Sequence, residues 1–240
     1  MQDHIERVAQ NLFRTEALQV APVDQPYWYT SGTLGPYYIN THYLFGGAEQ
    51  ANGLLALIDE CLMGDRLELP ARVGGACMDQ YASDADYRTL IDRAVHATVG
   101  SRGIYPEYDA ISGGERRDYH FSYALAEALK LPHITLFKDG AAVWTEVGFT
   151  AARELGSDEL QGLRVLHVAD LVTEASSYLR AWLPALRGLG AEITETLAIV
   201  DRHQGGREVL EAEGVELQAL IVLDARFFEE AVAGGLMTEE

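Results

Sequence analysis

A short run of small and hydroxyl-bearing residues follows a strongly apolar segment in the second half of the chain. The two together read VLHVADLVTEASS, residues 165–177, in which Asp170 closes the apolar part and hydroxyl groups come from Thr173, Ser176 and Ser177. Backbone amides and hydroxyls of such a loop can converge on a phosphate, helped by the positive end of a helix that begins there. Asp170 would then accept hydrogen bonds from hydroxyl groups of the same ligand. The alternative is an ordinary strand-to-helix turn with a serine as helix cap.

Arg116 and Arg117, in SGGERRDYH, form a second candidate for anion binding. The arginine side chain is suited to bidentate contacts with phosphate oxygens. Because the chain has 37 acidic and only 18 basic residues, the alternative is that both arginines pair with nearby carboxylates. Three histidines are interpreted as structural: His167 as a residue of a predicted strand, and His120 and His133 as exposed residues at helix edges or in loops.

The elements that must position these groups follow from the alternation of apolar and amphipathic segments. Segments rich in β-branched residues predict strands at residues 108–112, 133–137, 164–170, 193–201 and 217–224. Helical patterns occur at about 3–15, 48–63, 83–99, 119–130, 175–188, 205–213 and 225–233. This order is typical of the α/β class, with a parallel sheet flanked by crossover helices. Ligands bind at the carboxyl ends of such strands, where Asp170 lies.

Two regions depart from this rhythm. Residues 19–45 include WYTSGTLGPYYIN, whose aromatic residues and Gly/Pro turns predict short antiparallel strands in a lobe over the sheet. Residues 64–107 predict one helix and no further element.

Length and composition restrict the class of protein. A chain of 240 residues can bury a core as one domain, and no apolar run reaches the roughly 18 to 20 residues that cross a bilayer. The net charge of −19 would repel a nucleic-acid backbone, so nucleic acid is not an expected partner. The first residues lack the pattern of a secretory signal, and we expect a cytoplasmic protein. Cys61 and Cys77 form no paired pattern that would indicate a disulfide or a zinc site.

From residue 163 to about 237 the chain resembles the type I phosphoribosyltransferases, most closely the orotate phosphoribosyltransferases. The family's strand ends in two acidic residues, two apolar residues and a Thr-x-Gly-Thr/Ser loop, and here ADLVTEASS takes that place. The more specific match is GAEITETLAIVDRHQGGREVLEAEGVELQALIVLD, with its Asp-Arg turn and Gly-Gly-Arg-Glu helix start. TSGTLGPYYIN is similar to the family's N-terminal hood, and YDAISGGERRDYHFSYALAEALKLPHITLFKDG to its pyrophosphate loop and the strand before its mobile catalytic loop.

The resemblance implies a type I phosphoribosyltransferase fold in a single domain, residues 1–240, with a hood at roughly 17–45 and a core at roughly 105–240. It implies transfer from phosphoribosyl pyrophosphate (PRPP) to a nitrogenous base, with Mg²⁺ as cofactor, no metal ligand assigned in the chain, and a homodimer. Lys138 and Asp170 would be catalytic, and Asp170 would also bind ribose. PRPP and its phosphates would be bound by Asp170, Thr173, Glu174, Ala175, Ser176, Ser177, Arg116 and Arg117. The base would contact Arg202, Thr30, Tyr37 and Tyr38. The alternatives are that Arg202 pairs with Asp201 and that the two tyrosines are packing residues.

Four departures from the family pattern bear on activity. Ala169 stands at the first acidic position, and Glu174 places a carboxylate inside the phosphate loop, where it would repel a phosphate. Thr30 replaces the lysine before the hood's Ser-Gly, and FKDGAAVWTEVGF keeps only Lys138 of the cations expected in the mobile loop.

Three hypotheses follow from the match and its departures. The first is an orotate-type phosphoribosyltransferase. The second is a catalytically impaired relative that binds a nucleotide or phosphorylated metabolite in a regulatory role, and the third is an interaction protein with a vestigial pocket.

Overall fold

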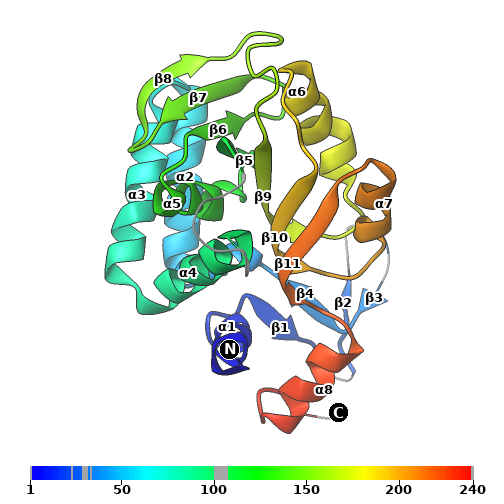
Figure 1. Ribbon diagram of the computed structural model, residues 1–240. Coiled ribbons are helices and arrows are strands. Elements are labelled where there is room, and N and C mark those ends of the chain that lie inside the picture. Colours follow the sequence, from blue (N-terminus) through cyan, green and yellow to red (C-terminus); the bar gives the residue numbers. More distant parts are fainter. Residues whose placement is uncertain (1, 23, 29–31, 33, 100–107, 239–240) are drawn as a thin grey trace.

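Seven strands form the central sheet of this protein, in the order β11-β10-β9-β5-β6-β7-β8 (Figure 1). The structure, a computed structural model, describes all residues except 1, 23, 29–31, 33, 100–107 and 239–240. The five strands on one side of the sheet run parallel to their neighbours. They are β5 (Ala110–Gly114), β6 (His133–Leu136), β9 (Val165–Val172), β10 (Glu195–Asp201) and β11 (Glu216–Val222). All five were predicted from the sequence, and the predicted fold class is confirmed.

Helices cover both faces of the sheet, which explains why its central strands are apolar on both sides. Four helices pack on one face, with β9 residues such as Val168 in the shared core: α2 (Ala48–Met63), α3 (Leu69–Ser83), α4 (Ala85–Val99) and α5 (Tyr119–Leu129). The other face carries η2 (Tyr178–Trp182), a turn of π-helix that continues into α6 (Leu183–Gly188), and α7 (Gly206–Ala212).

The hood consists of short antiparallel pairs, as the aromatic and Gly/Pro pattern predicted. β1 (Leu18–Val20) pairs with β4 (Tyr37–Ile39), β2 (Tyr27–Trp28) pairs with β3 (Leu34–Gly35), and η1 (Thr41–Phe45) follows. The hood lies with α1 (Gln2–Arg14) and α8 (Ala225–Ala233) at one end of the sheet, at the bottom of Figure 1. No helix within the described ranges combines the length and apolar character needed to cross a bilayer.

Two elements were not predicted. The segment 137–149 was expected to lie in a mobile loop, but its middle part forms β7 (Ala142–Glu146), which pairs antiparallel with β6 and with β8 (Thr150–Glu154). A short edge hairpin shows only a weak alternation of buried and exposed residues, so its sequence is easily mistaken for that of a loop. The second missed element is α3, whose sequence LPARVGGACMDQYAS contains two adjacent glycines that lower helix propensity.

The two glycines of α3 have different surroundings. A Cβ atom on Gly74 would lie 2.4 Å from a ring carbon of Phe149, whereas a Cβ on Gly75 would meet nothing within 4 Å. Gly74 is therefore required where α3 approaches the turn between β7 and β8, and Gly75 is not.

Substituting these neighbours should change stability in opposite directions. Gly74→Ala forces the buried Phe149 ring to move and should lower the free energy of unfolding by about 1 to 3 kcal/mol. Gly75→Ala, the matched control, should raise it by up to about 1 kcal/mol because alanine is the better helix former. Urea denaturation of the two variants measures both values, and equal effects would contradict this account of the α3 contact.

Two histidines expected at exposed edges are buried instead. His120 packs edge-on against Phe45 in the core under η1, and His133 stacks on Tyr123 at 4.0 Å between ring centroids. The prediction was wrong because α5, which carries His120, is covered on nearly all sides, and because His133 lies in β6, whose residues are all buried. Burial lowers the pKa of His120 to about 4 and that of His133 to about 3.

Candidate active site

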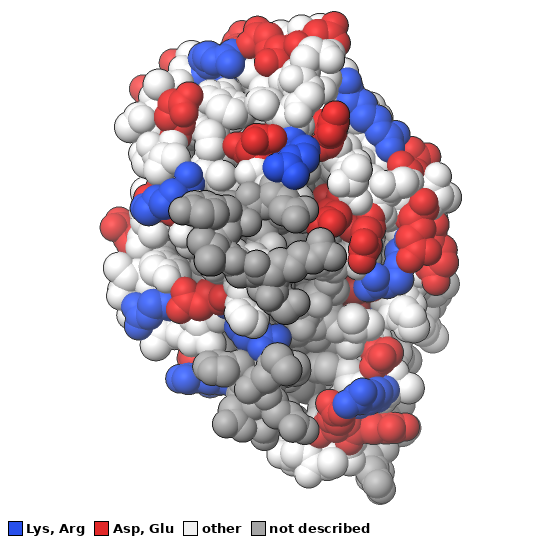
Figure 2. Space-filling model, in the orientation of Figure 1, with Lys and Arg blue, Asp and Glu red and all other residues white. Residues whose placement is uncertain are grey.

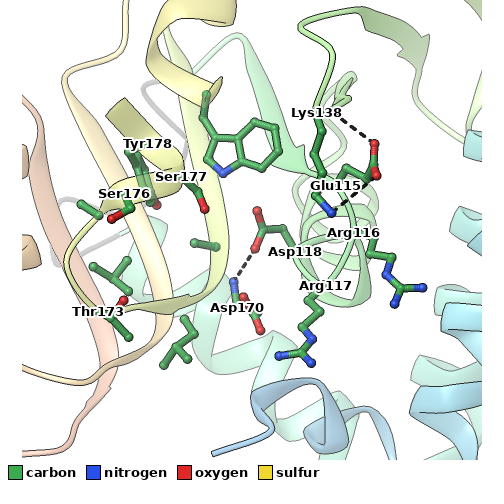
Figure 3. A pocket seen from close by; sticks show the side chains of 15 residues that line it. Glu115, Arg116, Arg117, Asp118, Lys138, Asp170, Thr173, Ser176, Ser177 and Tyr178 are labelled. Atoms are coloured by element: carbon green, nitrogen blue, oxygen red, sulfur yellow. Dashed lines mark hydrogen bonds and ion pairs between the residues drawn. The ribbon is translucent and has the colours of Figure 1, made fainter. Parts of the chain in front are cut away.

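Three loops meet at the carboxyl ends of neighbouring strands and enclose a cavity of about 370 Å³ (Figure 3). One loop follows β5, one follows β9, and Lys138 comes from the turn after β6. This is where a parallel sheet is expected to bind a ligand. The cavity is lined by Glu115, Arg116, Arg117, Asp118, Lys138, Ala169, Asp170, Leu171, Val172, Thr173, Ala175, Ser176, Ser177, Tyr178 and Trp182.

The loop after β9 turns through Ala175, whose φ of 54° is in the left-handed region, and the helix begins at Ser176. The start of the loop is fixed by α7, because the Thr173 carbonyl accepts a hydrogen bond of 2.9 Å from the backbone N–H of Gly206. A Cβ on Gly206 would lie 2.5 Å from that carbonyl oxygen. The second glycine of the Gly-Gly-Arg-Glu motif is thus required for close contact between α7 and the loop.

Glu174 is the member of this loop that does not line the cavity. Its side chain is exposed, whereas Thr173, Ala175, Ser176 and Ser177 all border the cavity. Glu174 stays a predicted phosphate-binding residue only through its backbone amide, because its side chain does not line the cavity. Because the carboxylate is solvated, the repulsion expected from it inside the loop is largely screened.

The three cations at the cavity differ in whether a carboxylate already holds them. Arg116 forms an ion pair with Asp59 of α2, and Lys138 lies 3.7 Å from Glu115, to which it also donates its backbone N–H at 3.1 Å (Figure 3). For Arg116, the structure therefore agrees with the alternative that this arginine pairs with a nearby carboxylate. Arg117 is exposed at the cavity, and among the described residues its guanidinium has neither an ion pair nor a hydrogen bond.

Asp118 is a cavity residue that sequence reasoning missed. Its carboxylate accepts hydrogen bonds from the backbone amides of Asp170, at 2.9 Å to Oδ1, and Gly114, at 3.1 Å to Oδ2. It therefore ties the loop after β5 to the end of β9, and Figure 3 shows the two aspartates side by side in the cavity. Its position between the arginines and a helix start was a weak signal in the sequence.

Both aspartates are poorly solvated. Burial raises the pKa of Asp118 well above its ordinary range, with the charge of Asp170 acting in the same direction. Burial also raises the pKa of Asp170 to about 6, an increase that the nearby Arg117 charge limits. Asp170 Oδ2 is buried and has no hydrogen-bond partner. An acceptor in this state is costly unless a ligand supplies a donor.

His167 lies behind Asp118, on the side of the sheet covered by η2. Its Nδ1 is 3.0 Å from Ser112 Oγ, and its Nε2 is 3.7 Å from Asp118 Oδ2. Burial lowers the pKa of His167 to about 3, so the ring is neutral near pH 7. His167 is a buried sheet residue, as interpreted from the sequence.

Three of the four residues predicted to contact a base, namely Arg202, Tyr37 and Tyr38, lie outside the cavity. The Arg202 guanidinium is 5.0 Å from the centroid of the Tyr37 ring, which also packs against Phe228 of α8, at 5.2 Å between centroids. Tyr38 is 42% exposed and lies against Tyr27. None of these three predicted residues lines the cavity, and Thr30 lies outside the described residues.

Arg202 nevertheless lies beside the phosphate loop. Its backbone N–H donates a hydrogen bond of 2.9 Å to the Val172 carbonyl at the end of β9. The alternative partner for Arg202, Asp201, instead forms an ion pair of 3.2 Å with Arg207.

Charged side chains on the face shown in Figure 2 are interspersed, with lysines and arginines beside aspartates and glutamates. Among the described residues drawn there, the basic ones form no continuous patch. The described residues also include no group of three or more His, Cys, Asp or Glu side chains placed to hold a metal ion.

Known proteins with similar sequences are phosphoribosyltransferases. The orotate phosphoribosyltransferase of Pyrococcus furiosus is 31% identical over 138 residues, which cover 58% of this chain and 71% of that protein. The adenine phosphoribosyltransferase of Chelativorans sp. is 31% identical over 144 residues, covering 56% and 76%. The sequence matches no family model.

The fold agrees with these relatives. The solved structure of orotate phosphoribosyltransferase from Aeropyrum pernix superposes with a TM-score of 0.59 at 18% sequence identity, and covers 93% of this chain and 98% of that one. The chain therefore belongs to the type I phosphoribosyltransferases. Its sequence is equally close to orotate and adenine enzymes, so the family relationship leaves the base open.

Proposed function

We propose that this protein transfers the phosphoribosyl group of PRPP to orotate and releases pyrophosphate. The observation that carries the proposal is the single cavity in which the loop at residues 173–177, the Asp118 and Asp170 carboxylates and the unpaired Arg117 converge. These groups suit a ligand that has a phosphate at one end, hydroxyl groups in the middle and a second anionic group at the other end.

The chemistry required is substitution at the anomeric carbon of ribose. The bond from this carbon to the pyrophosphate oxygen breaks, the base nitrogen forms a new bond to it, and pyrophosphate leaves with the electron pair. Charge separates in the transition state, so fixed cations near the leaving group lower the barrier. Arg117 and Lys138 are placed to stabilise the pyrophosphate, while the loop amides hold the 5′-phosphate.

Arg202 supports orotate as the base. Its guanidinium can form bidentate contacts with a carboxylate, which orotate has and adenine lacks. Tyr37 holds the arginine at the boundary between the hood and the sheet end, next to Val172 at the end of β9.

Mg²⁺ is part of this proposal. It is commonly held by one or two carboxylates together with substrate oxygens and water. The Asp170 carboxylate, with an unpartnered buried oxygen at the cavity, fits this requirement and would hold the ion together with PRPP. The bound ion would neutralise part of the pyrophosphate charge.

Pyrophosphate release tests the proposed function. The purified protein is mixed with PRPP and Mg²⁺, and pyrophosphate is measured with orotate, adenine or uracil as the base. We expect release that depends on orotate, and Arg202→Ala should reduce it far more with orotate than with a base that has no carboxylate. If pyrophosphate is released with adenine alone, adenine and not orotate is the substrate. If pyrophosphate is released with none of the bases, the proposed transferase activity is contradicted.

A second candidate function is favoured by the ion pairs at the cavity. Lys138 and Arg116 are already held by Glu115 and Asp59, which leaves fewer free cations for a departing pyrophosphate. A protein with this arrangement can bind a nucleotide or phosphorylated metabolite and act as a regulator without turnover. Calorimetric binding of orotidine monophosphate in the absence of pyrophosphate release from PRPP would support this function.

A further inference from the structure

The chemical groups that line the cavity differ from one end to the other. The loop at residues 173–177 suits a phosphate, and Arg117 suits a second anion. Between them lie Asp118 and Asp170, with exposed fractions of only 7% and 8%. Two buried carboxylates repel an anionic group at this place, so the middle of the ligand must be uncharged or donate hydrogen bonds.

The two carboxylates can both accept more hydrogen bonds than they now receive. Asp118 receives one backbone N–H at each oxygen, and its carboxyl, whose pKa burial raises, keeps free acceptor positions and can also donate its proton to a hydroxyl group. Asp170 Oδ2 receives none, although it is buried. Adjacent hydroxyl groups of a sugar supply the O–H donors that this pair lacks, and charge-assisted O–H···O⁻ hydrogen bonds are among the stronger ones.

Ala169 explains why the second carboxylate must come from another part of the chain. The residue before Asp170 borders the cavity but has only a methyl group, so β9 by itself presents one carboxylate. Asp118 reaches the same place from the loop after β5 and is fixed there by the Asp170 amide itself.

We infer that Asp118 takes the place of the carboxylate missing at Ala169, and that Asp118 and Asp170 together bind the two adjacent hydroxyl groups of a pentose phosphate. The inference rests on the proposed function, because it assigns the sugar subsite of the same cavity. Asp118 is then a residue that touches the substrate and decides between ribose and 2-deoxyribose.

Calorimetry with three probes tests this assignment: ribose 5-phosphate, 2-deoxyribose 5-phosphate and inorganic phosphate. The titrations contain EDTA, so that a bound cation plays no part. The wild-type protein should bind ribose 5-phosphate about 10- to 100-fold more tightly than the deoxy sugar, since the latter lacks one of the two hydroxyls. Asp118→Asn should reduce this preference to a few-fold, while its affinity for inorganic phosphate stays within about threefold of wild type.

A second variant moves the carboxylate back to β9. Asp118→Asn combined with Ala169→Asp should recover most of the preference for ribose 5-phosphate. The inference is overturned if Asp118→Asn keeps the full wild-type preference, or if the wild-type preference requires Mg²⁺.

Two further outcomes separate this inference from its premises. Wild-type protein that binds neither the sugar phosphates nor inorganic phosphate would contradict the proposed function itself. Should Asp118→Asn fail to fold, a wild-type crystal soaked with ribose 5-phosphate decides the matter. A sugar hydroxyl within about 3 Å of the Asp118 carboxylate is expected, and hydroxyls bound to Asp170 alone would overturn the inference.

Discussion

Replacing Arg117 by alanine is expected to lower kcat/KM for PRPP by about 10- to 100-fold. A hydrogen bond to a charged group contributes about 1.5 to 3 kcal/mol, and each 1.4 kcal/mol corresponds to a factor of ten in rate. Arg117 lies at the cavity and forms no hydrogen bond or ion pair with a carboxylate among the described residues, so a ligand need not displace such a partner to contact its guanidinium. Initial rates of pyrophosphate release at varied PRPP concentration measure the effect.

Arg116→Ala is the matched control for this prediction. The two arginines are neighbours in the sequence and both line the cavity, but Arg116 is held by Asp59. Its removal should lower kcat/KM by less than about tenfold, because the ligand must compete with that carboxylate for the guanidinium. A larger loss for Arg116→Ala than for Arg117→Ala would show that the ion pair breaks when PRPP binds.

Lowering the pH from 7 to 5 is expected to destabilise the fold. The pKa of His120 falls to about 4 on folding, and those of His133 and His167 to about 3, against 6.5 for a free histidine. The unfolded chain therefore binds protons that the native protein excludes, and stability falls as the pH drops below 6.5. At pH 5 each of these histidines costs about 2 kcal/mol, or about 6 kcal/mol for the three, and His42, whose pKa burial lowers to about 3, adds to this loss.

The buried carboxyls act in the opposite direction. Their raised pKa values mean that the native protein takes up protons before the unfolded chain does, which stabilises it as the pH falls. Asp118 and Asp170 therefore offset part of the loss between pH 7 and 5. A net decrease remains, because each of these two carboxyls can take up at most one proton over this range, whereas four buried histidines exclude one proton each.

Urea unfolding at pH 7 and pH 5 measures this decrease. His133→Gln serves as the comparison, because it removes one buried imidazole from the titration. The variant should be less stable at pH 7, where the contacts of His133 with Ser122 and Tyr123 are lost, but its stability should change with pH by about 2 kcal/mol less than that of the wild type. Equal pH dependence of stability in the two proteins would contradict the conclusion that His133 is buried in its neutral form.

The sequence predicted the parallel part of the fold well because its signals are local and strong. Buried strands such as β9 are continuous apolar runs, and helices such as α2 carry a regular pattern, so both were located within a few residues. The hairpin β7–β8 and helix α3 were missed because they depend on tertiary contacts. Position 74 requires glycine because a larger residue would collide with the ring of Phe149, and these two residues are far apart in the sequence.

The location of the candidate site was predicted because it follows from the topology of the sheet. The pairing of its side chains was missed because it depends on the geometry of the folded chain. Strand ends gather at one edge of a parallel sheet, so Asp170, the phosphate loop and the arginines were expected to lie together. Which arginine is paired depends on Asp59, a residue of a distant helix. Asp118 was missed because its role rests on two hydrogen bonds, to Gly114 and Asp170, that only the folded chain brings into reach.

The contact between Lys138 and Glu115 makes anion binding at this lysine an exchange reaction. In the proposed function, a pyrophosphate oxygen would compete with the Glu115 carboxylate, which lies 3.7 Å from the ammonium group. The free energy gained from Lys138 is thus the difference between two ion pairs rather than the strength of one. Glu115 itself lines the cavity, so in the proposed function its carboxylate would also oppose the negative charge of the pyrophosphate and favour its departure as product.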